Sequence, residues 1–165
     1  MTTYVRKFCA RIAVMLALAL IAMFISVGPL LAADAPSHRR PVFNDPIVGT
    51  WNCSIPPAGG APAFTDIKNI HAGGTQSEID NAAPPSQESP TVGSWVNTGG
   101  RSYAQRAFQM SWDPNENFIG TWHYTGPMSL SPALNQLNIR GTATLVDTDG
   151  NVITSFPFTA SCTRL

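Results

Sequence analysis

A strict two-residue alternation in the C-terminal part of the chain constrains its fold more than any other feature. Residues 137–146 place one set of side chains on the same side: Leu137, Ile139, Gly141, Ala143 and Leu145. After "DTDGN" (147–151) the alternation resumes, and one side carries Val152, Thr154, Phe156, Phe158, Ala160 and Cys162. A period of two is that of a β-strand, and Gly150 permits the positive φ that a tight turn requires. These residues therefore predict one long antiparallel hairpin.

Weaker alternation, interrupted by Gly, Pro, Asn and Asp, continues upstream and predicts further strands. Their expected ranges are 47–54, 63–71, 75–79, 92–98, 101–112 and 118–124, with 81–90 as a loop that carries three prolines. The last of these strands can continue through Leu130, although Pro127 and Pro132 indicate a bend or a sheet edge. No stretch keeps the helical period for more than a turn or two. We therefore expect an all-β domain over residues 47–165.

About eight consecutive antiparallel strands can close into an up-and-down barrel or form a two-sheet sandwich. Closing the barrel removes both exposed sheet edges and places the first strand beside the last. Cys53 lies on the first predicted strand and Cys162 on the last, so closure brings the two within disulfide reach. Strand number and cysteine placement both favour an antiparallel up-and-down eight-stranded barrel, with a two-sheet β-sandwich as the alternative.

The N-terminal part of the chain has the composition of a secretory signal peptide. Its basic start is formed by Arg6, Lys7 and Arg11. An almost unbroken apolar run follows at 12–31, and then the small residues of "LLAADA". We expect cleavage after Ala33, with Ala35 as the other position, so that residues 1–33 are the signal peptide and 34–46 a flexible linker. An uncleaved membrane anchor is the alternative, because about 20 apolar residues can span a bilayer.

Removal of the leader changes the charge of the chain. The whole sequence has ten basic and ten acidic residues, and the leader takes three basic residues and no acidic one. The mature part therefore holds seven basic against ten acidic residues, a net charge of −3. Because no basic stripe remains, we expect neither nucleic acid nor an acidic membrane surface as a partner, and no stable membrane insertion after cleavage. We expect a periplasmic or secreted protein.

Two cysteines remain in the mature part, Cys53 and Cys162. An even number of cysteines in an exported protein predicts a disulfide. A bridge that closes almost the whole domain would stabilise it by about 4–5 kcal/mol in the chain-entropy model. Two buried free thiols are the alternative.

The first predicted strand carries a Gly-x-Trp motif, Gly49-Thr50-Trp51. On an exported chain with eight predicted strands, this motif resembles the calycin superfamily of barrels, which includes lipocalins and avidins. The resemblance covers residues 47–165, and the chain is also similar to small exported lipocalin-like proteins of bacteria. It implies that Trp51 closes the base of the barrel and that Arg164 packs across its indole, a favourable cation–π contact.

The end of the chain departs from the lipocalin pattern. A lipocalin carries a helix after its eighth strand, whereas this sequence stops at Leu165, directly after the last predicted strand. This departure favours the avidin-like or allene-oxide-cyclase-like barrels within the superfamily. The biotin-contacting residues of avidin cannot be mapped onto this sequence, so the resemblance does not imply biotin binding.

Catalytic and metal-binding motifs are not evident in the sequence. His71 and His123 have no zinc-site spacing and are expected at the surface, and no nucleophile elbow or phosphate loop occurs. We assign no metal, no cofactor and no catalytic residue. Asp66 and Glu78 lie on neighbouring predicted strands and can approach each other, but we interpret them as exposed charges on a hairpin.

Aromatic residues on most of the predicted strands give the strongest functional indication. The interior of an eight-stranded barrel is just wide enough for packed side chains or for one small ligand. The candidate ligand-contacting residues are Tyr103, Phe108, Trp112, Trp122 and Tyr124. Both faces of the strand at 101–112 carry polar and apolar residues, so the sequence leaves its inward face undecided.

Three functional hypotheses follow. The first is an exported barrel that binds a small, mostly apolar molecule, with a few polar groups that give selectivity. The second is an enzyme of the isomerase or cyclase type on the same barrel, which a titratable group buried in a cavity would favour. The third is a filled barrel that serves as a structural or interaction domain of the cell envelope.

Overall fold

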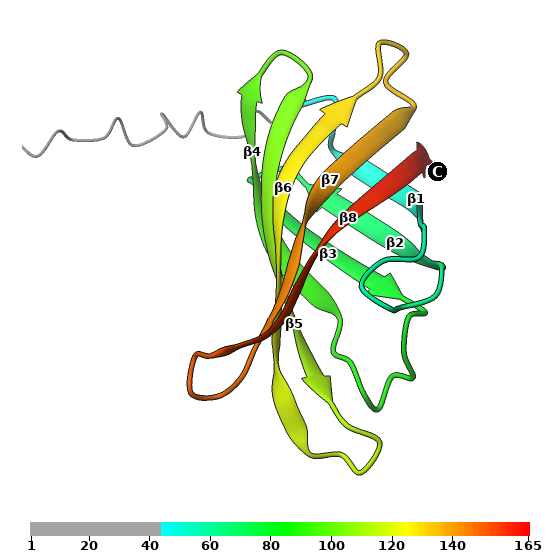
Figure 1. Cartoon of the computed structure of the whole chain (residues 1–165). Helices are drawn as coiled ribbons and strands as arrows, with labels where there is room; N and C mark the ends of the chain where they lie inside the picture. The colour runs from blue at the N-terminus through cyan, green and yellow to red at the C-terminus, as the bar shows by residue number, and fades with distance from the viewer. Residues whose placement is uncertain (1–43) are drawn as a thin grey trace, which may run out of the picture. The chain divides into compact units, whose positions relative to one another are not determined.

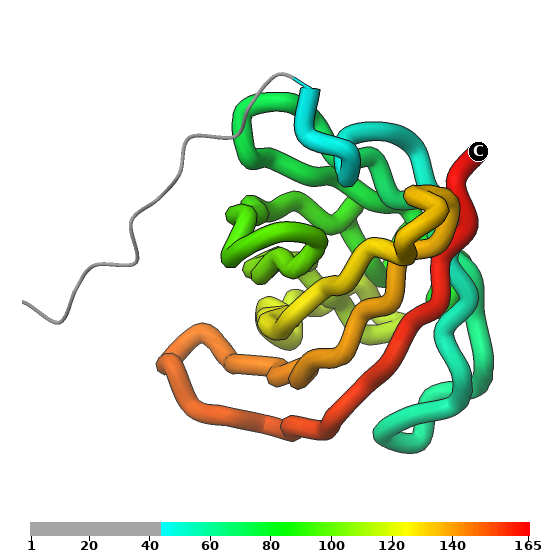
Figure 2. Tube along the Cα trace, turned by 90° about the horizontal axis from the view of Figure 1, so that it is seen from above, coloured from blue at the N-terminus to red at the C-terminus, as the bar shows by residue number. Residues whose placement is uncertain are grey.

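Eight strands follow one another along residues 44–165, the part of the chain that the computed structural model describes. Their bounds are β1 (Gly49–Ile55), β2 (Phe64–His71), β3 (Thr75–Asp80), β4 (Thr91–Gly99), β5 (Ser102–Trp112), β6 (Phe118–Leu130), β7 (Gln136–Val146) and β8 (Val152–Arg164). Each strand pairs antiparallel with the next, and β8 pairs with β1, so the sheet closes on itself (Figures 1 and 2). The predicted up-and-down barrel is confirmed, and the sandwich alternative is wrong.

The strand ends lie within about two residues of their predicted ranges, except in β6, which continues to Leu130. Pro127 lies opposite Ala104 of β5. It is accommodated in β6 because the ladder with β7 skips Gly126 and Pro127. A proline lacks the N–H that such a ladder needs. The predicted signal peptide and residues 34–43 of the predicted linker lie outside the described residues. Within residues 44–165, no helix is long and apolar enough to cross a membrane.

The first and last strands meet at a covalent seam. Cys53 of β1 lies opposite Cys162 of β8, and their sulfur atoms form a disulfide with a length of 2.06 Å. The predicted bridge is therefore present, and the alternative of two free thiols is wrong for this structure. The same ladder places Trp51 opposite Arg164, so the register of the seam also brings together the two side chains singled out by the resemblance.

Strand β5 shows which of its two faces points inward. Tyr103, Gln105, Ala107, Gln109 and Ser111 are buried. The other face carries Phe108, with Arg106 stacked over its ring at 5.2 Å and His123 of β6 against its edge. The inward face is therefore the more polar one, apart from Tyr103 and Ala107. This arrangement is possible because polar groups on β3 and β6 supply hydrogen-bond partners to the two glutamines.

The two ends of the barrel differ in packing. The closed end carries the turns 72–74, 100–101 and 131–135. The open end carries the segments 56–63, 81–90, 113–117 and 147–151, which lie on the right and at the bottom of Figure 1. A cluster of buried side chains lies toward the closed end: Ile47, Trp51, Ile70, Trp95, Tyr103, Met128, Leu130 and Leu137. Residues before β1 complete this cluster, since Ile47 is fully buried. The space toward the open end is not filled in this way.

Candidate ligand-binding site

Side chains from the first and the last strand close one end of the barrel. The Trp51 indole donates from Nε1 to the carbonyl of Ile47 at 3.0 Å, and the Arg164 guanidinium lies 4.2 Å from the centre of its ring. Arg164 also donates to the carbonyls of Val48 (2.9 Å) and Leu134 (3.0 Å) and to that of Pro46. Every arm of the guanidinium thus has an acceptor, and the cation is held over the indole.

Gly49 leaves the space that this arrangement needs. A Cβ at this position would lie 2.5 Å from Nη1 of Arg164, and the φ of Gly49 is +147°, which L side chains rarely adopt. The Gly-x-Trp motif therefore has a local physical reason: the glycine lets the guanidinium pass and the tryptophan receives it. The structure brings Gly49, Trp51 and Arg164 together, as the resemblance implies.

A cavity of about 120 Å³ occupies the open end and reaches solvent. Its surface is mostly apolar, with side chains from all eight strands and from the 56–63 and 81–90 loops: Ile55, Ala58, Ala61, Phe64, Asp66, Lys68, Glu78, Asp80, Ala82, Glu88, Thr91, Gln105, Trp122, Tyr124, Ile139, Ala143, Phe156, Phe158 and Ala160. An apolar cavity of about 150 Å³ can hold a benzene molecule. The cavity is therefore of the size of one ring or of a short aliphatic group.

One side of the cavity is an aromatic wall, formed by Trp122 and Tyr124 of β6 and by Phe156 and Phe158 of β8. Trp122 packs edge-on against Phe156 with centroids 5.7 Å apart, and Tyr124 packs against Phe158 at 5.9 Å. The strand between them, β7, carries Gly141 opposite Phe158 and Ala143 opposite Phe156. Because these residues are small, rings from the two flanking strands can lean together across β7.

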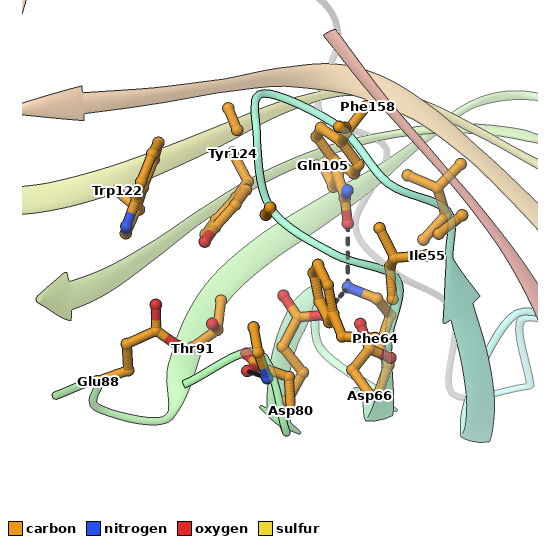
Figure 3. A pocket seen from close by; sticks show the side chains of 18 of the residues that line it. Ile55, Phe64, Asp66, Asp80, Glu88, Thr91, Gln105, Trp122, Tyr124 and Phe158 are labelled. Atoms are coloured by element: carbon orange, nitrogen blue, oxygen red, sulfur yellow. Dashed lines mark hydrogen bonds and ion pairs between the residues drawn. The ribbon is translucent and has the colours of Figure 1, made fainter. Parts of the chain in front are cut away.

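The opposite side is an acidic wall, formed by Asp66 of β2, Asp80 of β3 and Glu88 of the 81–90 loop. In Figure 3, Trp122 and Tyr124 face Glu88 and Asp80 across the pocket. Asp66 and Asp80 lie directly opposite each other in the β2–β3 ladder. Like charges at opposed positions of an antiparallel pair destabilise it. The sheet therefore disfavours ionisation of both carboxyl groups at the same time.

Deeper in the barrel the same two strands carry opposite charges. Lys68 lies opposite Glu78, with 2.5 Å between Nζ and Oε2, and both side chains are almost completely buried. Nζ of Lys68 also donates to Oε1 of Gln105 at 3.3 Å, the dashed contact near the centre of Figure 3. Among residues 44–165, Lys68 carries the one ammonium group that lines the cavity. Glu78 already pairs it, so it leaves the acidic wall largely uncompensated.

Burial and crowding of carboxyl groups change their protonation. Burial, and then the charge of Glu78, raise the pKa of Asp66 from 3.8 to about 8, although Lys68 acts in the opposite direction. Burial, and then the charge of Asp80, raise the pKa of Glu88 to about 7. Both acids therefore exchange a proton near neutral pH. Burial and the surrounding carboxylates also raise the pKa of Tyr124, so its hydroxyl stays protonated and donates.

Gln109 connects the two walls. Its Oε1 accepts from the hydroxyl of Tyr124 at 2.7 Å, and its Nε2 donates to Oδ2 of Asp80 at 3.1 Å and to Oε2 of Glu88 at 3.4 Å. One amide thus orients the phenol of the aromatic wall and draws two carboxylates of the acidic wall together. Asp66 differs from them: it is 8% exposed, and its Oδ1 has no hydrogen-bond partner among the described residues.

The loop between β1 and β2 lies across the mouth of the cavity. Ala58 and Ala61 pair through their backbones and line the cavity from this loop. Gly59 has a φ of +59°, and a Cβ there would lie 2.2 Å from the ring of Phe156. The loop therefore rests directly on the aromatic wall, and only a glycine permits this approach.

The five aromatic residues predicted to contact a ligand fall into three locations. Trp122 and Tyr124 line the cavity. Tyr103 is buried toward the closed end, where its hydroxyl donates to Oδ1 of Asp45 at 2.7 Å. Phe108 and Trp112 lie on the outward face of β5, away from the cavity, because the inward positions of this strand are the odd-numbered ones.

The interpretation of Asp66 and Glu78 as exposed charges is wrong, because both point into the barrel and are buried. Sequence reasoning also did not single out Lys68, Asp80, Glu88, Phe64, Phe156 and Phe158 as lining residues. A usable signal was present in β2, where the two-residue period puts Asp66 and Lys68 on the same face as Ile70. It was ambiguous because the opposite face carries Ile67, which is exposed.

The fold and the site together define a closed antiparallel eight-stranded barrel with one packed end and one hollow end. No protein-family model matches the sequence, and neither a curated protein nor a solved structure matches the chain.

Proposed function

We propose that the protein is an exported, calycin-like barrel that binds a small molecule in the cavity at its open end. The observation that carries this proposal is the cavity itself, of about 120 Å³, lined by an aromatic wall and open to solvent. A ring-sized apolar group placed there would leave water and gain contact with Trp122, Tyr124 and Phe156. The Cys53–Cys162 bridge is compatible with export, because disulfides persist in oxidising compartments.

The closed end supports the same proposal from the other side. Trp51, Arg164 and the residues before β1 fill one end of the barrel, so we expect a ligand to enter at the other end, where the cavity opens to solvent. A rigid base and a lined opening are the arrangement in which eight-stranded barrels hold one small ligand. Trp51 and Arg164 are also the residues that carry the resemblance to the calycin superfamily.

The tryptophans allow a direct test with a small neutral probe. Benzyl alcohol in the cavity would contact Trp122, whereas Trp112 lies on the outer face. We expect it to change the tryptophan fluorescence of the wild-type protein and of Trp112→Phe, and not that of Trp122→Phe. Calorimetric titration of the three proteins measures binding independently of the reporter. Absence of saturable binding to the wild-type protein would overturn the proposal, and native mass spectrometry of protein from its own host would identify the natural occupant.

A second candidate is an enzyme of the isomerase or cyclase type on the same barrel. It is favoured by Asp66 and Glu78, two carboxyl groups buried side by side in the cavity, since a carboxyl with a pKa near neutrality can accept and return a proton. Asp66→Asn would then retain the substrate unchanged. An isomerase predicts small molecules of equal mass but different structure in the wild-type and variant proteins. Identical occupants would exclude this candidate.

A further inference from the structure

The contrast between the two walls restricts the chemistry of an occupant. The aromatic wall offers ring faces, and the acidic wall offers oxygen atoms with negative or titratable charge on Asp66, Asp80 and Glu88. Four carboxyl groups line the cavity: Asp66, Glu78, Asp80 and Glu88. Among the described residues the lining contains a single cationic side chain, Lys68, which Glu78 already pairs. An anionic ligand would meet repulsion here, and a neutral one would leave this charge uncompensated.

Asp66 provides a second and independent indication. Its side chain is more than nine-tenths buried and lines the cavity, yet Oδ1 lacks a hydrogen-bond partner in residues 44–165. A buried polar atom without a partner costs about 1–3 kcal/mol. The other acids of the wall are partly satisfied by Gln109. The orphaned oxygen therefore marks a position at which a donor from a bound molecule would be favourable.

We propose that the cavity binds an organic ammonium ion, with its ring or short apolar group on the aromatic wall and its ammonium group at the acidic wall. The three N–H donors of a primary ammonium group match oxygen atoms of Asp66, Asp80 and Glu88. The nearby faces of Trp122 and Tyr124 add a cation–π attraction. This inference rests on the proposed function and specifies the class of ligand.

Binding of such a cation is coupled to proton release. The groups that face Asp66 and Glu88 are Lys68 on β2, Glu78 and Asp80 on β3, and Tyr124 on β6. In the empty cavity their arrangement holds protons on Asp66 and Glu88 near neutral pH, and a bound cation favours the ionised forms. The affinity for an ammonium ion therefore rises with pH while the ligand itself stays charged, which for an aliphatic amine extends to about pH 9.

The experiment compares three probes of similar shape: benzylammonium, benzyl alcohol and benzoate. We expect calorimetry at pH 8 to give at least about tenfold tighter binding of benzylammonium than of benzyl alcohol, and no binding of benzoate. Between pH 6 and pH 8 the affinity for benzylammonium should rise at least about threefold, with proton release visible as a dependence on the ionisation enthalpy of the buffer. The affinity for benzyl alcohol should stay nearly constant.

Variants separate the acidic wall from the general charge of the open end. Asp80→Asn and Glu88→Gln should each weaken benzylammonium binding about tenfold and weaken benzyl alcohol binding much less. Asp149→Asn is the matched control, because it removes a carboxylate from the exposed 147–151 turn at the same end. If it weakened binding as much as Glu88→Gln, the effect would be one of overall charge and the inference would be wrong.

The outcomes distinguish the two proposals. Equal binding of benzylammonium and benzyl alcohol would overturn the ammonium inference and leave the proposed function standing. Failure of both probes to bind would overturn the proposed function. Tighter binding of Ca²⁺ than of benzylammonium would replace the organic cation by a metal ion and overturn the inference as well. Since these comparisons use the wild-type protein, they do not depend on the folding of any variant.

Discussion

Both ends of the barrel place charged side chains among aromatic rings, but they satisfy these charges differently. At the closed end, Arg164 has three carbonyl acceptors and an indole face, and Asp45 accepts from Tyr103, Asn97 and the Ile47 amide. At the open end, Asp66 has an unpartnered oxygen and faces Asp80 across the ladder. A charge that is fully paired holds a structure together, whereas one left unpaired in a cavity costs stability and is available to a ligand.

The largest effect is expected from removing the covalent seam, the Cys53–Cys162 disulfide. Replacing both cysteines, Cys53→Ser with Cys162→Ser, should lower the free energy of unfolding by about 4–5 kcal/mol, because the bridge closes a loop with a sequence separation of 109. Urea unfolding followed by far-UV circular dichroism measures the loss, and non-reducing peptide mapping of the wild-type protein checks the bridge. An unchanged midpoint would mean that the barrel closes without help from the disulfide.

Replacement of Arg164 tests the closed end, where the charges are paired. Arg164→Ala should cost about 2–4 kcal/mol, since it removes the cation over Trp51 and leaves three carbonyls without their donor. Arg164→Lys keeps the charge but not the planar fork, so it should recover only part of this loss. Urea unfolding of both variants gives the values. Equal stability of the alanine variant and the wild-type protein would contradict a structural role for this charge.

Replacement of Asp66 should stabilise the folded protein, whereas replacement of Arg164 should destabilise it. The folded-state pKa of Asp66, about 8, lies above its ordinary value of 3.8, so the folded protein keeps a proton that the unfolded chain loses. The free energy of unfolding should therefore fall as the pH rises from about 4 to about 8. Asp66→Asn should remove most of this slope and be more stable than the wild-type protein at pH 8 by about 1–3 kcal/mol. Thermal unfolding across this pH range would refute the prediction if the variant were less stable at pH 8.

Glu88 should show a weaker form of the same behaviour. Its pKa is raised to about 7, but the side chain is only half-buried and solvent screens its interaction with Asp80. Glu88→Gln should gain less than about 1 kcal/mol at pH 8 and nothing at pH 4, by the same unfolding measurement. A loss of stability at pH 8 would indicate that Glu88 is held in place by partners rather than crowded by them.

The fold and the closed end were largely accessible from the sequence. Alternation on β7 and β8, the number of strands and the placement of Cys53 and Cys162 are local or pairwise patterns, and they led to the barrel and its disulfide. The motif at Gly49 pointed to the contact between Trp51 and Arg164. These features are readable because each depends on one strand or on one pair of strands.

The open end was harder to predict from the sequence, because its buried polar side chains have their partners on several different strands. Lys68 of β2 can point inward only because Glu78 of β3 and Gln105 of β5 receive it. The inward face of β5 likewise carries two buried glutamines, whereas its outward face carries apolar residues. Hydrophobicity alone would therefore predict the wrong inward face for this strand. The register of three strands must be known before such positions can be recognised, and a single sequence does not supply it.

The covalent seam also determines how the domain would respond to tension. In a chain pulled from its two ends, the force passes through the Cys53–Cys162 bridge and bypasses everything between them. A sequence separation of 109 corresponds to about 370 Å of extended chain that cannot be drawn out. The bridge likewise keeps both fragments attached after a single cut in any loop between the two cysteines.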